Sequence, residues 1–181
     1  MNRPEHNALH YPLKAVAALL SYPEAAVVEH VDDLADVLVV RPELAPADRQ
    51  ALEDFVGWVR DSDLLDVQAA YVETFDRSKK VSLYLFEHVY GESRDRGPAM
   101  VELSMAYREK GLHIDSQELP DFVPMFLEFC AELPESEARD WVEETGHVLQ
   151  QVHVRLAERE SRFAIPFRVL LRMRSEEHTS E

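Results

Sequence analysis

The chain has 181 residues, of which 46% are hydrophobic and 30% charged, and its formal net charge is −16. The hydrophobic fraction excludes a disordered chain, and the length suits one domain with its own core. The negative charge argues against nucleic acid and anionic membrane surfaces as main partners, since both would repel it. We also expect no stable membrane insertion, because no apolar run approaches the roughly 20 residues of a membrane span.

Two further features of the sequence bear on its location and fold. The N-terminus lacks a signal-peptide pattern, and the single cysteine, Cys130, suits a reducing cytosol. Only five glycines occur, while helix-forming residues such as Ala, Leu, Glu and Arg dominate. This composition predicts an all-α protein, because sandwiches and barrels need many turn glycines and β-branched residues.

Apolar residues recur at the helical period along almost the whole chain. Asp61 and Asp63 are cap candidates before the fourth of these segments. With short loops between them, about eight helices form a single bundle. The predicted helices cover residues 13–20, 27–38, 52–59, 64–75, 98–107, 122–133, 134–156 and 163–173.

The middle of the chain is less regular. A short basic stretch, residues 77–80, precedes an apolar run over 81–90 that fits either a strand or a short helix. A polar loop over 91–97 follows, bracketed by glycines. Residues 118–121 read as a turn, with Asp121 as a candidate cap for the helix after it.

The end of the chain differs in character from the rest. Residues 174–181 read RSEEHTSE, which looks like a translated sequencing adapter. We therefore expect the native domain to cover residues 1–173, the last eight residues to be an artefact or scar, and a native C-terminal segment to be missing.

The familiar catalytic and cofactor motifs are absent from the sequence. It contains no Gly-rich phosphate loop, no Cys-x-x-Cys and no His-Glu-x-x-His, and its histidines are scattered. The acidic run 61–66 lacks the glycine and the final glutamate of a calcium loop. Cys130 lies in an apolar stripe, where a buried thiol is expected rather than a nucleophile. We expect no metal, no cofactor and no catalytic residue.

Several segments, taken in order, resemble one known family. These are LLSYP at 19–23, YVETFD at 71–76, LYLFEHVYGESRDRG at 83–97 and ELPDFVP at 118–124. They resemble the NarJ-type assembly chaperones of respiratory nitrate reductase, within the wider TorD-like family of redox-enzyme maturation proteins. The resemblance covers nearly the whole chain up to Met173.

This resemblance implies an all-helical, cytoplasmic, non-catalytic chaperone, mostly monomeric. It would bind the immature catalytic subunit of nitrate reductase through an N-terminal remnant of a twin-arginine signal, which binds as an amphipathic helix. It would promote insertion of the molybdenum cofactor and complex assembly, with molybdenum cofactor biosynthesis proteins as further partners. The acidic, aromatic-rich sequence agrees physically, because a basic amphipathic peptide would be steered toward it.

The resemblance also carries over the client-binding residues. It implies that the rings of the 71–76 segment form a groove floor and that the 83–88 segment forms its wall with Glu87 facing the client. It also implies that the 94–96 loop orients the groove or touches the client, and that 118–124 is a hinge-like turn between the two halves of the bundle. From the residues alone, core packing and solvated loops are the better explanation at each position taken singly. The carried-over residues are Tyr71, Phe75, Asp76, Leu83, Tyr84, Phe86, Glu87, His88, Arg94, Asp95, Arg96, Glu118, Leu119, Pro120, Asp121, Phe122 and Pro124.

Two alternatives stay open at this stage. One is a maturation chaperone for another molybdoenzyme, of the dimethyl sulfoxide or trimethylamine oxide reductase type. The other is a small helical enzyme or ligand-binding protein, in which Glu87 with His88, or Arg94 with Asp95, forms an acid/base or anion-binding pair. Neither pair has a third orienting partner in the sequence.

Overall fold

The computed structural model describes residues 7–114 and 117–174, and within these it contains eleven α-helices and one 3₁₀ turn. The only β-pairing in these ranges is an isolated antiparallel bridge. The elements are α1 (His10–Leu19), α2 (Ala25–Glu29), α3 (Val31–Val39), α4 (Pro46–Asp61), α5 (Leu64–Phe75), η1 (Lys79–Val81), α6 (Leu85–Val89), α7 (Arg96–Glu109), α8 (Val123–Ala131), α9 (Glu135–Glu144), α10 (Gly146–Glu158) and α11 (Ala164–Arg174).

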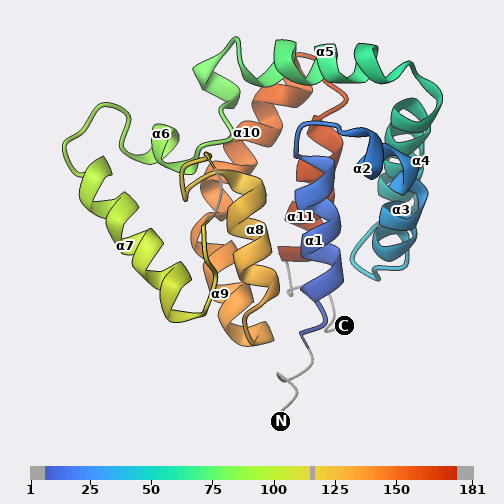
Figure 1. Cartoon of the computed structure of the whole chain (residues 1–181). Helices are drawn as coiled ribbons and strands as arrows, with labels where there is room; N and C mark the ends of the chain where they lie inside the picture. Colours follow the sequence, from blue (N-terminus) through green and yellow to red (C-terminus); the bar gives the residue numbers. More distant parts are fainter. Residues whose placement is uncertain (1–6, 115–116, 175–181) are drawn as a thin grey trace.

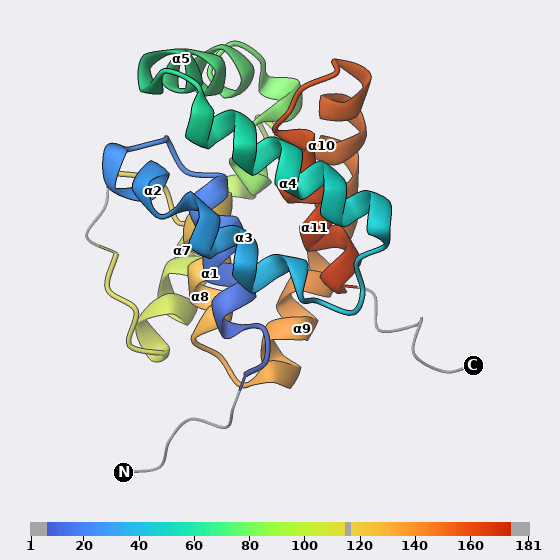
Figure 2. The same ribbon diagram turned by 90° about the vertical axis from the view of Figure 1, so that its right-hand side faces the viewer.

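The helices form a bundle that α5 closes at one end. Helix α1 packs against α3 and α8, and α11 packs against α4 and α10. Figures 1 and 2 show α5 lying across the end of this bundle, roughly perpendicular to α1 and α11. Helix α7 stands at the side of the bundle away from α3 and α4.

Helix α5 packs against the ring of Phe163, which lies just before α11. Its ring centroid lies 5.6 Å from that of Tyr71 and 5.3 Å from that of Phe75, both on α5. On its other side it meets Phe55 at 5.7 Å and Trp58 at 5.8 Å, both on α4. Edge-to-face ring pairs of this kind add about 0.5–1.5 kcal/mol each beyond their buried area. The cluster therefore fixes how α4 and α5 meet.

The prediction of an all-α protein is confirmed, but two predicted helices are wrong because each is divided. The predicted helix over 27–38 breaks at His30, whose φ of −110° lies outside the helical range. The predicted helix over 134–156 divides into α9 and α10 at Thr145. The Thr145 hydroxyl donates to the Val142 carbonyl at 2.9 Å, which competes with the helical backbone bonds.

The end of α11 lies over the glycine that follows this break. A Cβ added at Gly146 would collide with the guanidinium of Arg174, which covers it. Arg174 is the first residue of the octapeptide that we expect to be foreign, and residues 175–181 lie outside the described residues. Cys130 is fully buried, as expected of a core thiol.

His153 on α10 is a half-buried residue whose ring nitrogens are unusual. Both of its ring nitrogens are buried and have no hydrogen-bond partner among the described residues. Burial lowers the pKa of His153 from the ordinary 6.5, and the nearby Arg168 and Arg172 lower it further. His153 is therefore harder to protonate in the folded protein than in the unfolded chain, where the imidazole accepts a proton below about pH 6.5.

Stability should accordingly fall as the pH drops below 6.5, with a slope from this residue of at most about 1.4 kcal/mol per pH unit. In His153→Leu that part of the slope should disappear, because an apolar side chain takes no proton. Urea unfolding at a series of pH values measures it. The control His113→Leu removes an exposed imidazole, and loss of the same slope there would contradict the assignment.

Candidate functional site

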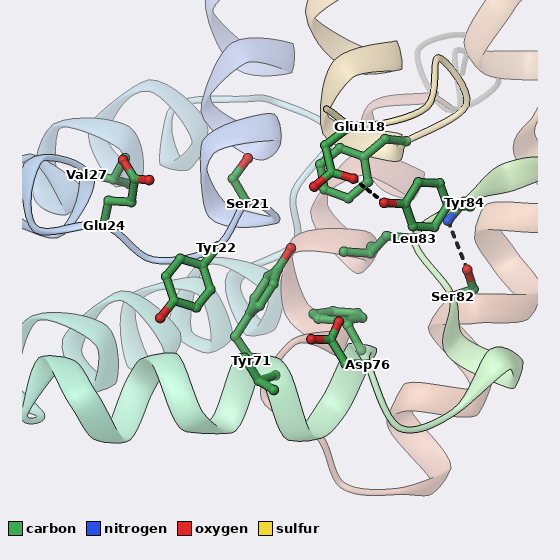
Figure 3. A pocket seen from close by; sticks show the side chains of 13 residues that line it. Ser21, Tyr22, Glu24, Val27, Tyr71, Asp76, Ser82, Leu83, Tyr84 and Glu118 are labelled. Carbon is green, nitrogen blue, oxygen red and sulfur yellow. Dashed lines mark hydrogen bonds between the residues drawn. The ribbon is translucent and has the colours of Figure 1, made fainter. Parts of the chain in front are cut away.

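A cavity of about 570 Å³ lies under α5, between that helix and two loops. Figure 3 shows that its side chains come from three stretches far apart in the sequence. The lining residues are Ser21, Tyr22, Glu24, Val27, Tyr71, Val72, Phe75, Asp76, Ser82, Leu83, Tyr84, Glu118 and Phe122. We call this cavity the groove.

Helix α5 supplies the floor of the groove, and side-chain hydrogen bonds hold it in place. The Asp63 carboxylate caps its first turn by accepting from the Leu65 N–H at 3.0 Å. The Tyr71 hydroxyl donates to the Leu20 carbonyl at 2.8 Å, and the Gln68 amide donates to the Pro23 carbonyl at 2.7 Å. These two bonds join α5 to the segment between α1 and α2, so that both segments line one cavity.

The floor presents aromatic surface. The Tyr71 and Phe75 rings pack at 4.9 Å, and the Tyr22 ring stands edge-on to Tyr71 at 5.8 Å. Tyr22 is 44% exposed and Val72 39%, although both are large apolar side chains. Apolar surface left open beside a hollow is typical of a binding site.

Short backbone pairing builds the opposite wall. The N–H of Val123 donates to the Leu83 carbonyl at 2.8 Å, and the N–H of Leu85 donates to the Asp121 carbonyl at 3.1 Å. Between them Tyr84 and Phe122 form the antiparallel bridge, with ring centroids 5.4 Å apart. The segment that fitted either a strand or a helix is therefore extended over 82–84 and helical only from Leu85.

The Asp121 carboxylate fixes this wall from inside. Its Oδ2 accepts from the Phe86 N–H at 2.9 Å, in the first turn of α6. Burial raises the pKa of Asp121, while the bond from Phe86 and the charge of Arg96 act in the opposite direction. The prediction that Asp121 caps the following helix is wrong: the residue at the N-cap of α8 is Phe122, and Asp121 instead satisfies a helix 35 positions earlier in the chain.

The charged side chains around the groove are acidic. Glu24, Asp76 and Glu118 line it, and all three are exposed. Glu118 accepts a hydrogen bond from the Tyr84 hydroxyl on the wall side of the groove, as Figure 3 shows. Among the described residues that line the groove there is no basic side chain. The site is therefore an apolar trough with a negative rim.

The structure brings together only part of the predicted site. The carried-over residues that line the groove are Tyr71, Phe75, Asp76, Leu83, Tyr84, Glu118 and Phe122. Those that do not line it are Phe86, Glu87, His88, Arg94, Asp95, Arg96, Leu119, Pro120, Asp121 and Pro124.

Several residues of the second group support the wall instead, as Asp121 does. Glu87 lies 3.8 Å from Arg96, and the His88 Nε2 lies 2.8 Å from the Ser82 carbonyl. The Pro120 carbonyl accepts from the Tyr107 hydroxyl at 2.7 Å. These contacts attach the wall to α6 and α7, whereas Arg94 and Asp95 are exposed in the loop before α7.

Sequence reasoning missed the contribution of the segment between α1 and α2. Ser21, Tyr22, Glu24 and Val27 line the groove, although none was a candidate. One signal was available, because Tyr22 precedes a proline between two helical stripes, where a large aromatic has no helix in which to bury itself.

The described residues offer no other evident chemistry. Across 7–114 and 117–174, no group of three or more His, Cys, Asp or Glu side chains is placed to hold a metal ion. None of the helices in this part of the chain has both the length and the apolar character needed to cross a membrane. The groove is the feature that remains to be explained.

Comparison with known proteins gives consistent results. The model of the nitrate reductase delta subunit family matches residues 41–168. The nitrate reductase molybdenum cofactor assembly chaperone NarJ of Escherichia coli strain K12 is 44% identical over 161 residues, which are 89% of this chain and 68% of that protein. A Bacillus subtilis (strain 168) protein that carries the NarJ name is 31% identical over 87% of this chain and 84% of its own.

One solved structure shares the fold. It is described as a redox enzyme maturation protein from Archaeoglobus fulgidus, and it superposes with a TM-score of 0.64 over 96% of each chain. At 22% sequence identity this likeness concerns the fold alone. It agrees with the expected TorD-like helical architecture.

The wall of the groove should depend on Asp121 as a hydrogen-bond acceptor. Asp121→Ala removes the acceptor for the Phe86 N–H and should lower the free energy of unfolding by about 2 kcal/mol. Asp121→Asn keeps an acceptor oxygen in place and removes the buried charge, so it should cost clearly less. Urea unfolding at neutral pH measures both variants.

Amide hydrogen exchange at Phe86 supplies the local measurement. Protection should persist in Asp121→Asn and be lost in Asp121→Ala. Equal loss of stability and of protection in the two variants would contradict the role of this oxygen.

Proposed function

The chain belongs to the nitrate reductase delta subunit family, and we propose that it is an assembly chaperone for respiratory nitrate reductase. It binds the immature catalytic subunit and keeps it competent for insertion of the molybdenum cofactor and for joining the other subunits. A relative from Escherichia coli supports this proposal, since that protein is named a nitrate reductase molybdenum cofactor assembly chaperone. The proposal makes it a binding protein rather than a catalyst.

The proposed client site is the groove, and its occupant is the N-terminal segment of the catalytic subunit, folded as a basic amphipathic helix. The observation that carries this proposal is the pairing of exposed aromatic surface with three carboxylates and no cation among the described lining residues. An amphipathic helix buries one apolar face in such a trough and leaves its charged residues at the rim. Basic residues there would face Glu24, Asp76 and Glu118.

The two kinds of surface have different physical roles. Contact with the rings of Tyr22, Tyr84 and Phe122, which are exposed or half-buried, removes apolar area from water at about 25 cal/mol per Å² and supplies most of the affinity. The rim carboxylates are exposed, so each ion pair adds about 0–1 kcal/mol and is weakened by salt. They speed the encounter with a basic segment and disfavour an acidic one. Such a complex is specific and still releases its client.

The proposed place of action is the cytoplasm, and the proposed partners extend beyond the client. A remnant of a twin-arginine signal would be read in the cytoplasm, before the client reaches the membrane, and molybdenum cofactor biosynthesis proteins are the further partners. No residue of the groove is assigned to the cofactor itself. The chaperone's task is to hold the client, and the cofactor is inserted into the client.

Calorimetric titration with the N-terminal peptide of the nitrate reductase catalytic subunit tests the proposal. We expect a dissociation constant of about 1 μM or tighter, which corresponds to about −8 kcal/mol. A scrambled peptide and the N-terminal peptide of a dimethyl sulfoxide reductase should bind at least tenfold more weakly. Tighter binding of the second peptide would assign the chaperone to that other client.

Charge reversal tests the groove as the binding site. Glu24→Lys combined with Asp76→Lys turns the rim positive and should weaken the native peptide at least tenfold. The matched control combines Asp140→Lys with Glu144→Lys on α9, which lies at the opposite end of the bundle from α5 (Figure 1). If both double variants weaken binding equally, the peptide binds elsewhere or responds only to net charge.

A further inference from the structure

A cluster of cations lies beside the groove and has no part in the proposed client site. The turn η1 packs against α10, which brings Lys79 and Lys80 to Arg155 and brings Ser78 to Arg159. Arg77 is exposed and directly precedes Ser78. The cations of this cluster are Arg77, Lys79, Lys80, Arg155 and Arg159. We call these five residues the basic patch. Arg155 lies in the last turn of α10, and Arg159 is the C-cap residue directly after this helix, four positions further on.

Tertiary hydrogen bonds organise the basic patch. Arg155 Nη1 donates to the Lys80 carbonyl at 2.9 Å, and Arg159 Nη2 donates to the Ser78 hydroxyl at 3.1 Å. Their partners are 75 and 81 positions away in the sequence. Each guanidinium has five N–H donors, so most donors of both remain available for another acceptor. The two arginines are held in position without being neutralised.

The absence of acidic partners sets the patch apart from most other cations of the chain. Within residues 7–114 and 117–174, none of its five members forms an ion pair. Elsewhere Lys14, Arg60 and Lys110 each lie within about 3 Å of a carboxylate. Asp76, Glu158 and Glu160 adjoin the patch in sequence, yet the patch keeps a surplus of positive charge in a chain whose formal net charge is −16.

We propose that the basic patch is a second docking surface, which binds an acidic, carboxylate-rich segment of a partner protein. Carboxylates pair with guanidinium groups in bidentate geometry, and the two arginines at the C-terminal end of α10 offer two such pairs, roughly one helical turn or about 6 Å apart. Lys79 and Lys80 are exposed and can follow an extended chain. The patch therefore binds a negatively charged segment, whereas the groove binds a positively charged one.

The charge of the whole molecule favours a short acidic segment over other anions. At physiological salt a charge acts over about 8 Å, so a few carboxylates feel mainly the five local cations. A nucleic acid, with a charge every few ångströms along its length, would extend beyond the patch and meet the acidic remainder. The cations are spread along a helix and a turn, an arrangement that suits a chain of carboxylates better than one phosphate.

The position of the patch relates it to the groove. Asp76 and Ser82 both line the groove, and residues 77–81 connect them. One partner could therefore place a basic apolar segment in the groove and an acidic segment on the patch. The inference does not require this, because an acidic segment binds the patch whether or not the groove is filled.

The test is fluorescence polarisation of a labelled twelve-residue peptide of alternating Glu and Ser, titrated with the full chain. Saturable binding that weakens with added salt is expected. Lys79→Glu combined with Lys80→Glu should weaken it at least tenfold. The fold should survive, because Arg155 binds the backbone carbonyl of Lys80 and not its side chain. Circular dichroism checks that this variant is folded. A second double variant, Arg155→Gln with Arg159→Gln, should also weaken binding of the peptide, without any change at the two lysines.

Two control variants separate this surface from general charge and from the groove. Arg108→Glu changes an exposed cation on α7 and should leave the affinity within twofold. Glu24→Lys, which alters the groove rim, should not weaken the acidic peptide, so failure of the groove proposal leaves this test intact. Absence of saturable binding, or equal loss in Arg108→Glu, would overturn the proposal.

Two further outcomes would also overturn it. Displacement of the peptide by inorganic phosphate at a lower concentration than by unlabelled peptide would assign the patch to phosphate groups. Dimerisation that is abolished by the Lys79→Glu, Lys80→Glu variant would assign it to a second copy of the chain, and light scattering measures that.

Discussion

Asp121 is completely buried, and the position of the groove wall depends on its carboxylate. One oxygen caps α6 through the Phe86 N–H, while the backbone on either side pairs with residues 83–85. Burying this carboxylate is costly, because its Oδ1 has no hydrogen-bond partner among the described residues. The bond at Oδ2 offsets part of that cost, and it forms only in this arrangement of the two segments. Tyr84 and Phe122 then face each other, and Tyr84 reaches Glu118. The wall therefore depends on this backbone pairing together with the buried carboxylate.

The floor depends on a different kind of interaction. Rings from α4 and α5 pack around Phe163, and the buried hydroxyl of Tyr71 reaches the carbonyl of Leu20. These contacts are packed and rigid, whereas Tyr22 and Val72 remain partly open to solvent. A rigid floor with open apolar side chains binds a partner without first having to be ordered, which reduces the entropic cost of association.

Charge then divides the surface into two regions that are joined by one loop. The groove rim carries carboxylates, and the turn that leaves it at Asp76 carries cations held against α10. A chaperone for a single client needs discrimination more than extreme affinity, and opposed charges at a fixed distance provide it. A partner with the reverse order of charges would meet repulsion at both places.

The sequence by itself determined the all-α class, the buried Cys130, and the aromatic pair Tyr71 and Phe75, because helical periodicity and composition are local properties. It also carried a family resemblance strong enough to point to an assembly chaperone. The sequence did not reveal the helix breaks at His30 and Thr145, because the apolar periodicity continues across a single non-helical residue. Only the tertiary structure placed Tyr22 beside Tyr71 and made Asp121 the cap of α6. Contacts between residues 35 to 50 positions apart are set by how the helices pack, and no local pattern encodes them.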